Sequence, residues 1–147
     1  MKRIEPVRKR SKDILEDLLD GHAEADREGP ETARRYLERV IASNHSLPNA
    51  VKFFTYDLLA EACARVGDDA RLREAVELAL AYIPQAQEDA DRAFAKYLPE
   101  IRCFERGIAA AVDDGEYTKA VELCDRAVAL GLGEVYARKR ASIDRWA

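Results

Sequence analysis

The chain has 147 residues and a formal net charge of −4, and 48% of its residues are hydrophobic. A domain of this length buries roughly 70% of the surface that its unfolded chain exposes, so we expect one domain with its own core. Nearly all of the 7 Gly and 5 Pro fall between segments whose apolar residues recur at helical spacing. The β-branched residues do not alternate with polar ones as they would in a strand. No stretch approaches the roughly 18 to 20 uninterrupted apolar residues of a membrane span. The sequence therefore predicts an all-α fold and argues against a membrane protein.

The charge is unevenly distributed along the chain. Residues 1–12 carry six Lys or Arg and one Glu, and residues 134–147 carry four Lys or Arg and two acids. With ends of +5 and +2, the total of −4 leaves −11 for the body from Asp13 to Gly133, which argues against nucleic-acid binding because phosphates need a basic surface. The basic start is not followed by the apolar stretch of a signal peptide. We expect residues 1–10 to form a flexible basic tail that folding does not require.

Residues 14–44 and 47–84 predict two helix hairpins, each with a glycine at the turn between its helices. In the first, helical spacing links Leu18, His22 and Ala25 before Gly29 with Ala33, Leu37, Val40 and Ile41 after it. In the second, the corresponding residues are Tyr56, Leu59, Ala60 and Cys63 before Gly67, and Leu72, Val76 and Ala79 after it. Asp68 is expected to cap the helix after Gly67, and Pro84 is expected to end the hairpin.

The remaining chain predicts an extra helical segment, a third hairpin and a final helix. The extra segment covers Gln85 to Leu98, keeps helical spacing at Ala90, Phe94, Tyr97 and Leu98, and should break or kink at Pro99 before the next helix. The third hairpin spans residues 100–131, with Phe104 in its first helix, a turn at Gly115 and an apolar stripe of Ala120, Cys124, Ala127 and Val128. The last helix, 133–146, has Val135, Tyr136, Ile143 and Trp146 on one side. We expect Leu59, Val76, Phe104 and Val128 to be buried.

The spacing of Gly115, Tyr117, Ala120 and Ala127 resembles the second helix of a tetratricopeptide repeat (TPR), and Tyr56, Leu59, Ala60 and Cys63 keep the spacing of its first helix with substituted residues. The resemblance covers about residues 15–133. It implies three TPR-like antiparallel hairpins in a right-handed solenoid, within a single domain over 11–147, closed by a capping helix at the open end. The turn glycines lie 38 and 48 residues apart, so each interval exceeds the 34-residue repeat of the family.

The reactive residues do not form a recognisable catalytic or metal site. His22 and Asp26 lie on one helical face, but the other histidine, His45, belongs to a separate turn. Three cysteines, Cys63, Cys103 and Cys124, sit in helical patterns, and we interpret them as core residues of a cytoplasmic protein. We therefore predict no catalysis, no metal and no cofactor.

The resemblance implies a function in protein or peptide binding, because the first helices of TPR hairpins line a concave groove. Carried onto this chain, the groove residues are Asp20, Asp57, Glu61, Arg65, Arg102, Glu105 and Arg106. This mixture of charges, without Asn, departs from the clamp with which the family grips a peptide carboxylate, and it suggests a partner with Lys or Arg and polar groups. Two alternatives are a structural protein that forms homodimers through the C-terminal helix around Trp146, and a regulator whose basic tail contacts an anionic partner.

Overall fold

The structure is a computed structural model that describes residues 11–43, 46–89 and 96–146. Over these residues it contains helices and no strand, which confirms the all-α fold class, and none of its helices is long and apolar enough to cross a membrane. The predicted basic tail of residues 1–10, as well as His45, Ala90 and Phe94, lies outside the described residues. The elements in chain order are α1 (Ser11–Arg27), α2 (Pro30–Ser43), α3 (Asn49–Val66), α4 (Asp69–Asp89), the 3-10 helix η1 (Leu98–Glu100), α6 (Cys103–Asp113), α7 (Tyr117–Ala129) and α8 (Glu134–Asp144).

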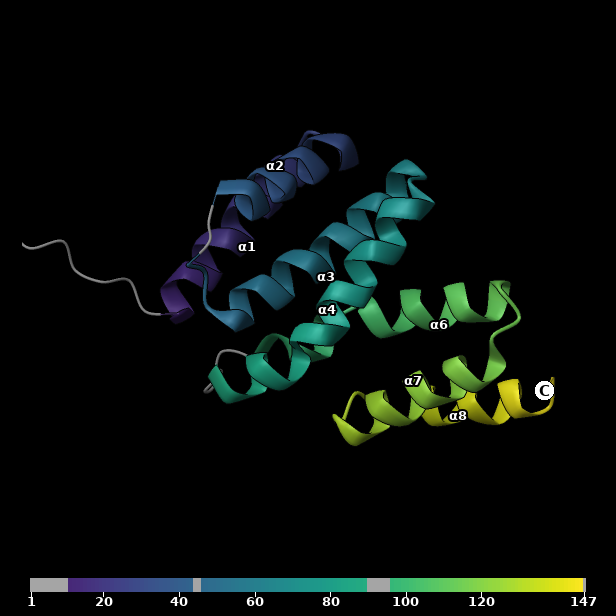
Figure 1. The fold of residues 1–147 in the computed structure, drawn as a ribbon. Helices are drawn as coiled ribbons and strands as arrows, with labels where there is room; N and C mark the ends of the chain where they lie inside the picture. Colours follow the sequence, from purple (N-terminus) through teal and green to yellow (C-terminus); the bar gives the residue numbers. More distant parts are fainter. Residues whose placement is uncertain (1–10, 44–45, 90–95, 147) are drawn as a thin grey trace, which may run out of the picture.

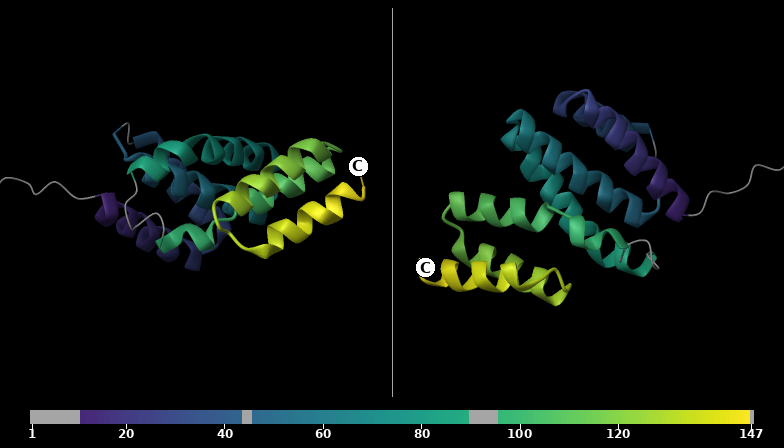
Figure 2. Two further views of the ribbon diagram at one scale, coloured as in Figure 1. Left: turned by 90° about the horizontal axis from the view of Figure 1, so that it is seen from below. Right: turned by 180° about the vertical axis from the view of Figure 1, so that it is seen from behind.

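Consecutive helices pack in pairs, and the pairs follow one another along the molecule. Figure 1 shows α1 beside α2, α3 beside α4, and α6 beside α7, with α8 at the opposite end of the array from α1 and α2. The two further views in Figure 2 show α8 along the outer side of the third pair, where it packs on α7. Helix α3 contacts α1, α2, α4 and α6, so it lies at the centre of a single continuous core.

The turn between α3 and α4 shows how the sequence closes a pair. Gly67 has a φ of 81°, in the left-handed region that a side chain disfavours, and the N–H of Asp68 donates to the carbonyl of Cys63 at 2.9 Å. The Asp68 carboxylate then accepts the N–H of Arg71 at 3.1 Å. This bond confirms Asp68 as the predicted N-cap of the following helix.

Three of the four predicted core side chains are buried, and one prediction is wrong. Leu59, Val76 and Phe104 are at most 3% exposed, whereas Val128 is 45% exposed. The buried stripe of α7 consists of Ala120, Leu123, Cys124 and Ala127. Val128 lies outside the edge of this stripe, about 40° around the helix beyond Cys124 and about 100° from Ala127, and therefore faces outward.

Helix α4 does not end at Pro84, so the prediction of a hairpin that closes there is wrong. The helix continues to Asp89, with Pro84 inside it, and Ile83 and Ala86 on either side of the proline are both buried. Proline lacks the N–H that would donate to the carbonyl of Leu80, four residues earlier. The guanidinium of Arg126 in α7 donates to that carbonyl at 3.3 Å, so a neighbouring helix supplies a donor that α4 cannot. Part of the predicted extra segment thus extends α4, and residues 90–95 lie outside the described residues.

One kind of ion pair occurs at both junctions between pairs. Arg34 in α2 donates to Asp68, which directly follows the turn after α3, at 2.9 Å. Arg73 in α4 donates to Asp114, directly after α6, in the same way. In each case an arginine near the start of the second helix of one pair reaches the aspartate after the first helix of the next pair.

A second kind of ion pair also repeats, between the second helices of successive pairs. Glu38 in α2 accepts two hydrogen bonds from Arg71 in α4, the shorter at 2.6 Å. Glu77 in α4 accepts one from Lys119 in α7 at 2.8 Å. The second pair therefore stacks on the first, and the third on the second, through corresponding contacts.

Candidate partner-binding groove

The residues predicted to line a groove lie on the first helices of the three pairs, where α1 contacts α3 and α3 contacts α6. Their locations are Asp20 in α1; Asp57, Glu61 and Arg65 in α3; and Arg102, Glu105 and Arg106 at the start of α6. All of them except Asp57 are at least partly exposed. Their side chains, however, engage each other and their neighbours in ways that the sequence pattern does not reveal.

Asp57 does not contribute a carboxylate to a groove, and the prediction that it does is wrong. Its side chain is 3% exposed, and Oδ1 accepts the backbone N–H of Arg102 at 2.9 Å and that of Cys103 at 2.7 Å. These N–H groups belong to the N-terminus of α6, where a helix has no internal acceptors. Burial raises the pKa of Asp57 to about 6, although the two backbone hydrogen bonds act in the opposite direction. Asp57 therefore caps α6 from a different helix, which is a structural role.

Four of the other predicted groove residues are held in ion pairs within the chain. Glu61 in α3 accepts two hydrogen bonds of 2.8 Å from Arg106 in α6, which lower the pKa of the Glu61 carboxyl. Arg102 pairs with Glu105 at 3.0 Å.

Of the two remaining predicted groove residues, one forms an ion pair and the other does not. Arg65 pairs with Asp26 of α1, so α1, α3 and α6 are connected by a row of ion pairs. Asp20 is exposed and forms no ion pair with another described residue. A partner that approached this row would have to compete with bonds already made.

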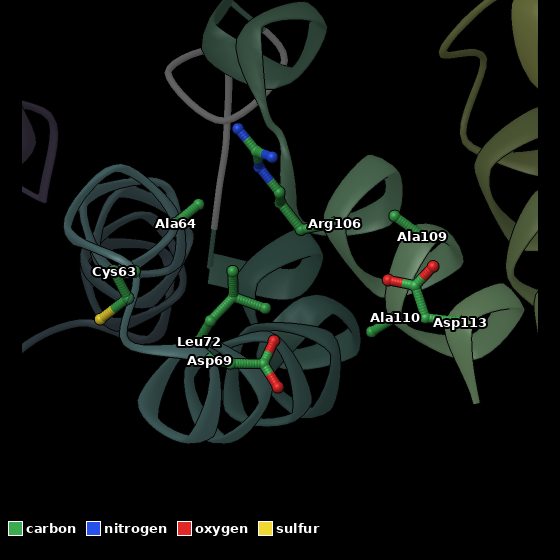
Figure 3. Close-up of a pocket in the computed structure, with 9 residues that line it drawn as sticks. Cys63, Ala64, Asp69, Leu72, Arg106, Ala109, Ala110 and Asp113 are labelled. Carbon is green, nitrogen blue, oxygen red and sulfur yellow. The ribbon is translucent and has the colours of Figure 1, made fainter.

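A small hollow of about 240 Å³ lies between the α3–α4 turn and α6 (Figure 3). Leu72 forms part of its wall, and the carboxylates of Asp69 and Asp113 border it from two helices. Figure 3 shows the Arg106 guanidinium pointing away from both carboxylates, consistent with its bonds to Glu61. The hollow is thus bordered by two carboxylates, of which Asp69 is paired with Arg73 at 2.9 Å, and it offers little apolar surface.

A larger and more apolar groove of about 510 Å³ lies between α6 and α8, on an adjacent face of α6 that shares Ala109 and Asp113 with the hollow. We call it the C-terminal groove. Ile108 of α6 and Ile143 of α8 line it and are each 3% exposed, whereas Val135 is 46% exposed and Trp146 is 60% exposed. The remaining lining residues are Ala109, Val112, Asp113, Arg138, Lys139 and Ser142. An apolar floor with an exposed aromatic at its edge is typical of a binding surface.

The charges of the C-terminal groove differ from those of the row along α1, α3 and α6. Arg138 and Lys139 line the groove and form no ion pair or hydrogen bond among the residues that the structure describes. Arg140, on the same helix, is paired with Asp125 of α7 and with Asp144. The groove thus holds two cations whose charge is not compensated by a bonded acid, opposite the single carboxylate of Asp113.

The sequence contains a signal for this groove, and the alternative of a homodimer through the C-terminal helix around Trp146 is based on it. Tyr136 and Ile143 are seven residues apart, about 20° around a helix, and both are buried. Val135 and Trp146 have the spacing of a second line, about 20° apart and about 60° to 100° from the first. Packing on the third pair requires one apolar line, and the second line, formed by Val135 and Trp146, remains exposed. Tyr136 packs edge-on against Phe104, with ring centroids 6.4 Å apart, while the Val135 side stays open.

The three cysteine side chains do not have the environment of a nucleophile. Cys63, Cys103 and Cys124 are free and buried, and burial raises the pKa of each thiol, that of Cys63 to about 11. A nucleophilic cysteine instead has a lowered pKa, because its thiolate is the reactive form. Among the described residues no group of three or more His, Cys, Asp or Glu could hold a metal ion.

Comparison of the chain with models of protein families, with curated proteins and with solved structures found no match.

Proposed function

We propose that this protein is a protein-binding module that receives its partner in the C-terminal groove. The observation that supports the proposal is the combination of a buried apolar floor, at Ile108 and Ile143, with exposed Val135 and Trp146 at the edge. Exposed apolar side chains around a concavity lose contact with water when a partner covers them, and aromatic residues contribute much of the binding free energy at such places.

The charged row along α1, α3 and α6 is a weaker candidate for the partner-binding surface. Glu61 and Arg106 hold each other through two hydrogen bonds, and Arg65 is engaged with Asp26. One exposed ion pair is worth about 0 to 1 kcal/mol, so exchanging it for another gains little. We therefore propose that the row holds the stacked helix pairs together and that the C-terminal groove binds the partner.

We further propose that the helix pairs form a TPR-like right-handed solenoid. Support comes from the repeated contacts, since Arg34 with Asp68 and Arg73 with Asp114 join successive pairs in corresponding positions. Repeat proteins are built by stacking one unit on the next through equivalent contacts. A crystal structure tests this directly, and successive pairs that turn with a left-handed sense would contradict it.

The proposed setting is the cytoplasm, and the proposed activity does not include catalysis. All three cysteines are free and buried, a condition that a reducing compartment maintains. Their raised pKa values disfavour the thiolate that nucleophilic chemistry requires.

Site-specific photocrosslinking tests the binding surface, because the chain offers a matched pair of positions. Val135 in the groove and Val128 on α7 are 46% and 45% exposed. A photoreactive residue at 135 should form an adduct with the partner in the native cell, and one at 128 should not. The partner, once purified, should bind wild type and Val128→Asp alike and lose affinity for Val135→Asp. Equal crosslinking at both positions, or equal affinity for both variants, would show that the groove is not the binding surface.

A further inference from the structure

The walls of the C-terminal groove limit the backbone conformation of whatever occupies it. Both walls are helices, α6 and α8, whose backbone N–H and C=O groups are bonded within the helix except at the ends. An extended peptide would find no backbone partners along such walls, and its own polar groups would depend on the few polar side chains there, such as Arg138, Lys139 and Ser142. A helical occupant satisfies its backbone internally and docks through side chains alone, as amphipathic helices do in other grooves.

The charges of the groove limit the side chains of the occupant. Arg138 and Lys139 line one wall without a bonded acid among the described residues. Covering these two cations with apolar groups would remove them from water without compensation, which is unfavourable. Carboxylates at the border of an apolar face would instead pair with them while the apolar face covers Val135 and Trp146.

A second copy of the chain meets these requirements poorly. A two-fold contact between two α8 helices would bring Arg138 and Lys139 of both copies into one interface, where like charges repel. The acidic helix α1 of a second copy is also unsuitable because Leu15 and Leu18 are buried and Ile14 and Leu19 already pack against the core. Outside the groove, Val128 is the one other large hydrophobic residue that is exposed in the described part of the chain.

We propose that the occupant of the C-terminal groove is an acidic amphipathic helix of another protein, with carboxylates placed beside its apolar stripe. This inference rests on the proposed function and adds the chemistry of the partner. The apolar stripe lies on Ile108, Ile143 and Trp146, and the carboxylates pair with Arg138 and Lys139.

The experiment uses the full chain and three synthetic helical peptides of about four turns. The peptides share one apolar stripe of Leu and Phe, and they differ only in the residues that flank it, which are Glu, Gln or Lys. None contains Trp or Tyr, so the peptides add no Trp or Tyr emission, and the Trp signal comes from Trp146, the single Trp of the protein. Titrations record Trp146 fluorescence and heat of binding at about 0.01 M and about 1 M salt, between which the Debye length falls from about 30 Å to about 3 Å.

At low salt, the Glu peptide should shift Trp146 emission to shorter wavelength and bind about tenfold more tightly than the Gln peptide, the effect of two partly exposed ion pairs. The advantage should disappear at high salt. In the double variant Arg138→Glu with Lys139→Glu, the preference should reverse in favour of the Lys peptide. The control is Arg35→Glu with Arg39→Glu, which changes the same charge on exposed residues of α2 and should retain the preference of wild type.

The contrary outcomes separate this inference from the proposed function. Equal binding of the three peptides, with loss of all three in Val135→Asp, would leave the groove as the binding surface and overturn the acidic partner. If none of the peptides changed Trp146 emission at about 1 mM, both the inference and the proposed function would fail. A change in Trp146 emission that followed protein concentration alone, with a dimer in sedimentation, would identify a second copy as the occupant and overturn the inference.

Discussion

The carboxylate of Asp57 in α3 accepts the backbone N–H of Cys103 at the start of α6, with Oδ1 2.7 Å from the nitrogen. The adjacent N–H of Arg102 donates to the same oxygen at 2.9 Å. The N-terminus of α6 thus takes its cap from the helix on which it packs rather than from its own sequence. The bond fixes α6 at a defined position along α3, and it does so with a group that titrates.

Asp57 should make the stability of the protein depend on pH in an unusual direction. Its pKa rises from 3.8 to about 6 in the folded protein because the side chain is buried, so between these values the folded state binds more protons than the unfolded state. The stabilisation is complete below about pH 4 and is lost as pH rises through about 6. The difference in the free energy of unfolding is about 3 kcal/mol. Urea unfolding of wild type and Asp57→Asn across this range isolates the contribution of Asp57 from that of other carboxylates.

Asparagine retains an oxygen that can accept both N–H groups but does not titrate. The free energy of wild type relative to Asp57→Asn should therefore decrease as pH rises from about 4 to 7. Asp57→Ala, which leaves the N–H groups without an acceptor, should be less stable than Asp57→Asn by about 1 to 2 kcal/mol. A difference between wild type and Asp57→Asn that stays constant with pH would show that the pKa is not raised.

Arg126 and Pro84 should be energetically coupled through the carbonyl of Leu80. Replacing Arg126 by Met keeps an apolar stem but removes the donor to Leu80 and the guanidinium that lies 5.8 Å from the ring centroid of Phe104, and it should cost about 1 to 3 kcal/mol. In a Pro84→Ala background, residue 84 regains an N–H that can donate to the same carbonyl, so the cost of Arg126→Met should fall. A double-mutant cycle by urea unfolding measures this coupling. An equal cost in both backgrounds would contradict it.

Two apolar residues of the third pair should respond very differently to truncation. Phe104 is fully buried, and Phe104→Ala should lower the free energy of unfolding by about 3 to 5 kcal/mol. Val128 is 45% exposed, and Val128→Ala should change it by no more than about 0.5 kcal/mol. Thermal unfolding followed by circular dichroism compares the two. A large loss in Val128→Ala would mean that this side chain packs against something in solution.

The three thiols should react slowly in the native protein. Cys63, Cys103 and Cys124 are buried with raised pKa values, so a disulfide reagent such as DTNB must wait for local or global opening. We expect the native rate to be at least about 100-fold lower than the rate in denaturant. Fast reaction of one thiol in the native state would show that it is accessible, and substitution by Ser would identify it.

Trp146 should report on binding but poorly on folding. Because its side chain is 60% exposed, its emission should differ little between the native and the urea-unfolded protein, while circular dichroism shows the full transition. Coincident large changes in both signals would mean that Trp146 is covered in the native protein in solution, for example by a second copy.

Local patterns predicted much of this molecule. Positions such as Leu59, Val76 and Phe104 are buried because helical periodicity places them on the apolar stripe of their own helix, and the cap at Asp68 depends on its immediate neighbours in the chain. Such features need only the sequence within a few turns, since side-chain direction and hydrogen bonding along a helix repeat every 3.6 residues.

The groove residues required information that no local pattern contains. Asp57 and Glu61 lie one turn apart on α3, and by spacing alone both are candidates for an exposed face. The packing of α6 buries Asp57 against the backbone of Arg102 and Cys103, while Glu61 reaches Arg106 at the edge. Which polar position is covered depends on the register between two helices about 45 residues apart in the chain.

The sequence by itself determined the helical class, the glycine turn at Gly67 and most of the apolar stripes, because these follow from periodicity and from the conformational freedom of glycine. The tertiary structure decided three further features. It placed a donor from Arg126 on the carbonyl that Pro84 leaves without one, and so α4 passes through a proline. It joined Glu61 to Arg106 and Arg102 to Glu105, and it left Val135 and Trp146 exposed beside Arg138 and Lys139. These outcomes depend on which side chains come into contact when the helices pack. Residues that are distant in the chain do not affect the local spacing of apolar residues, so the local pattern cannot predict such contacts.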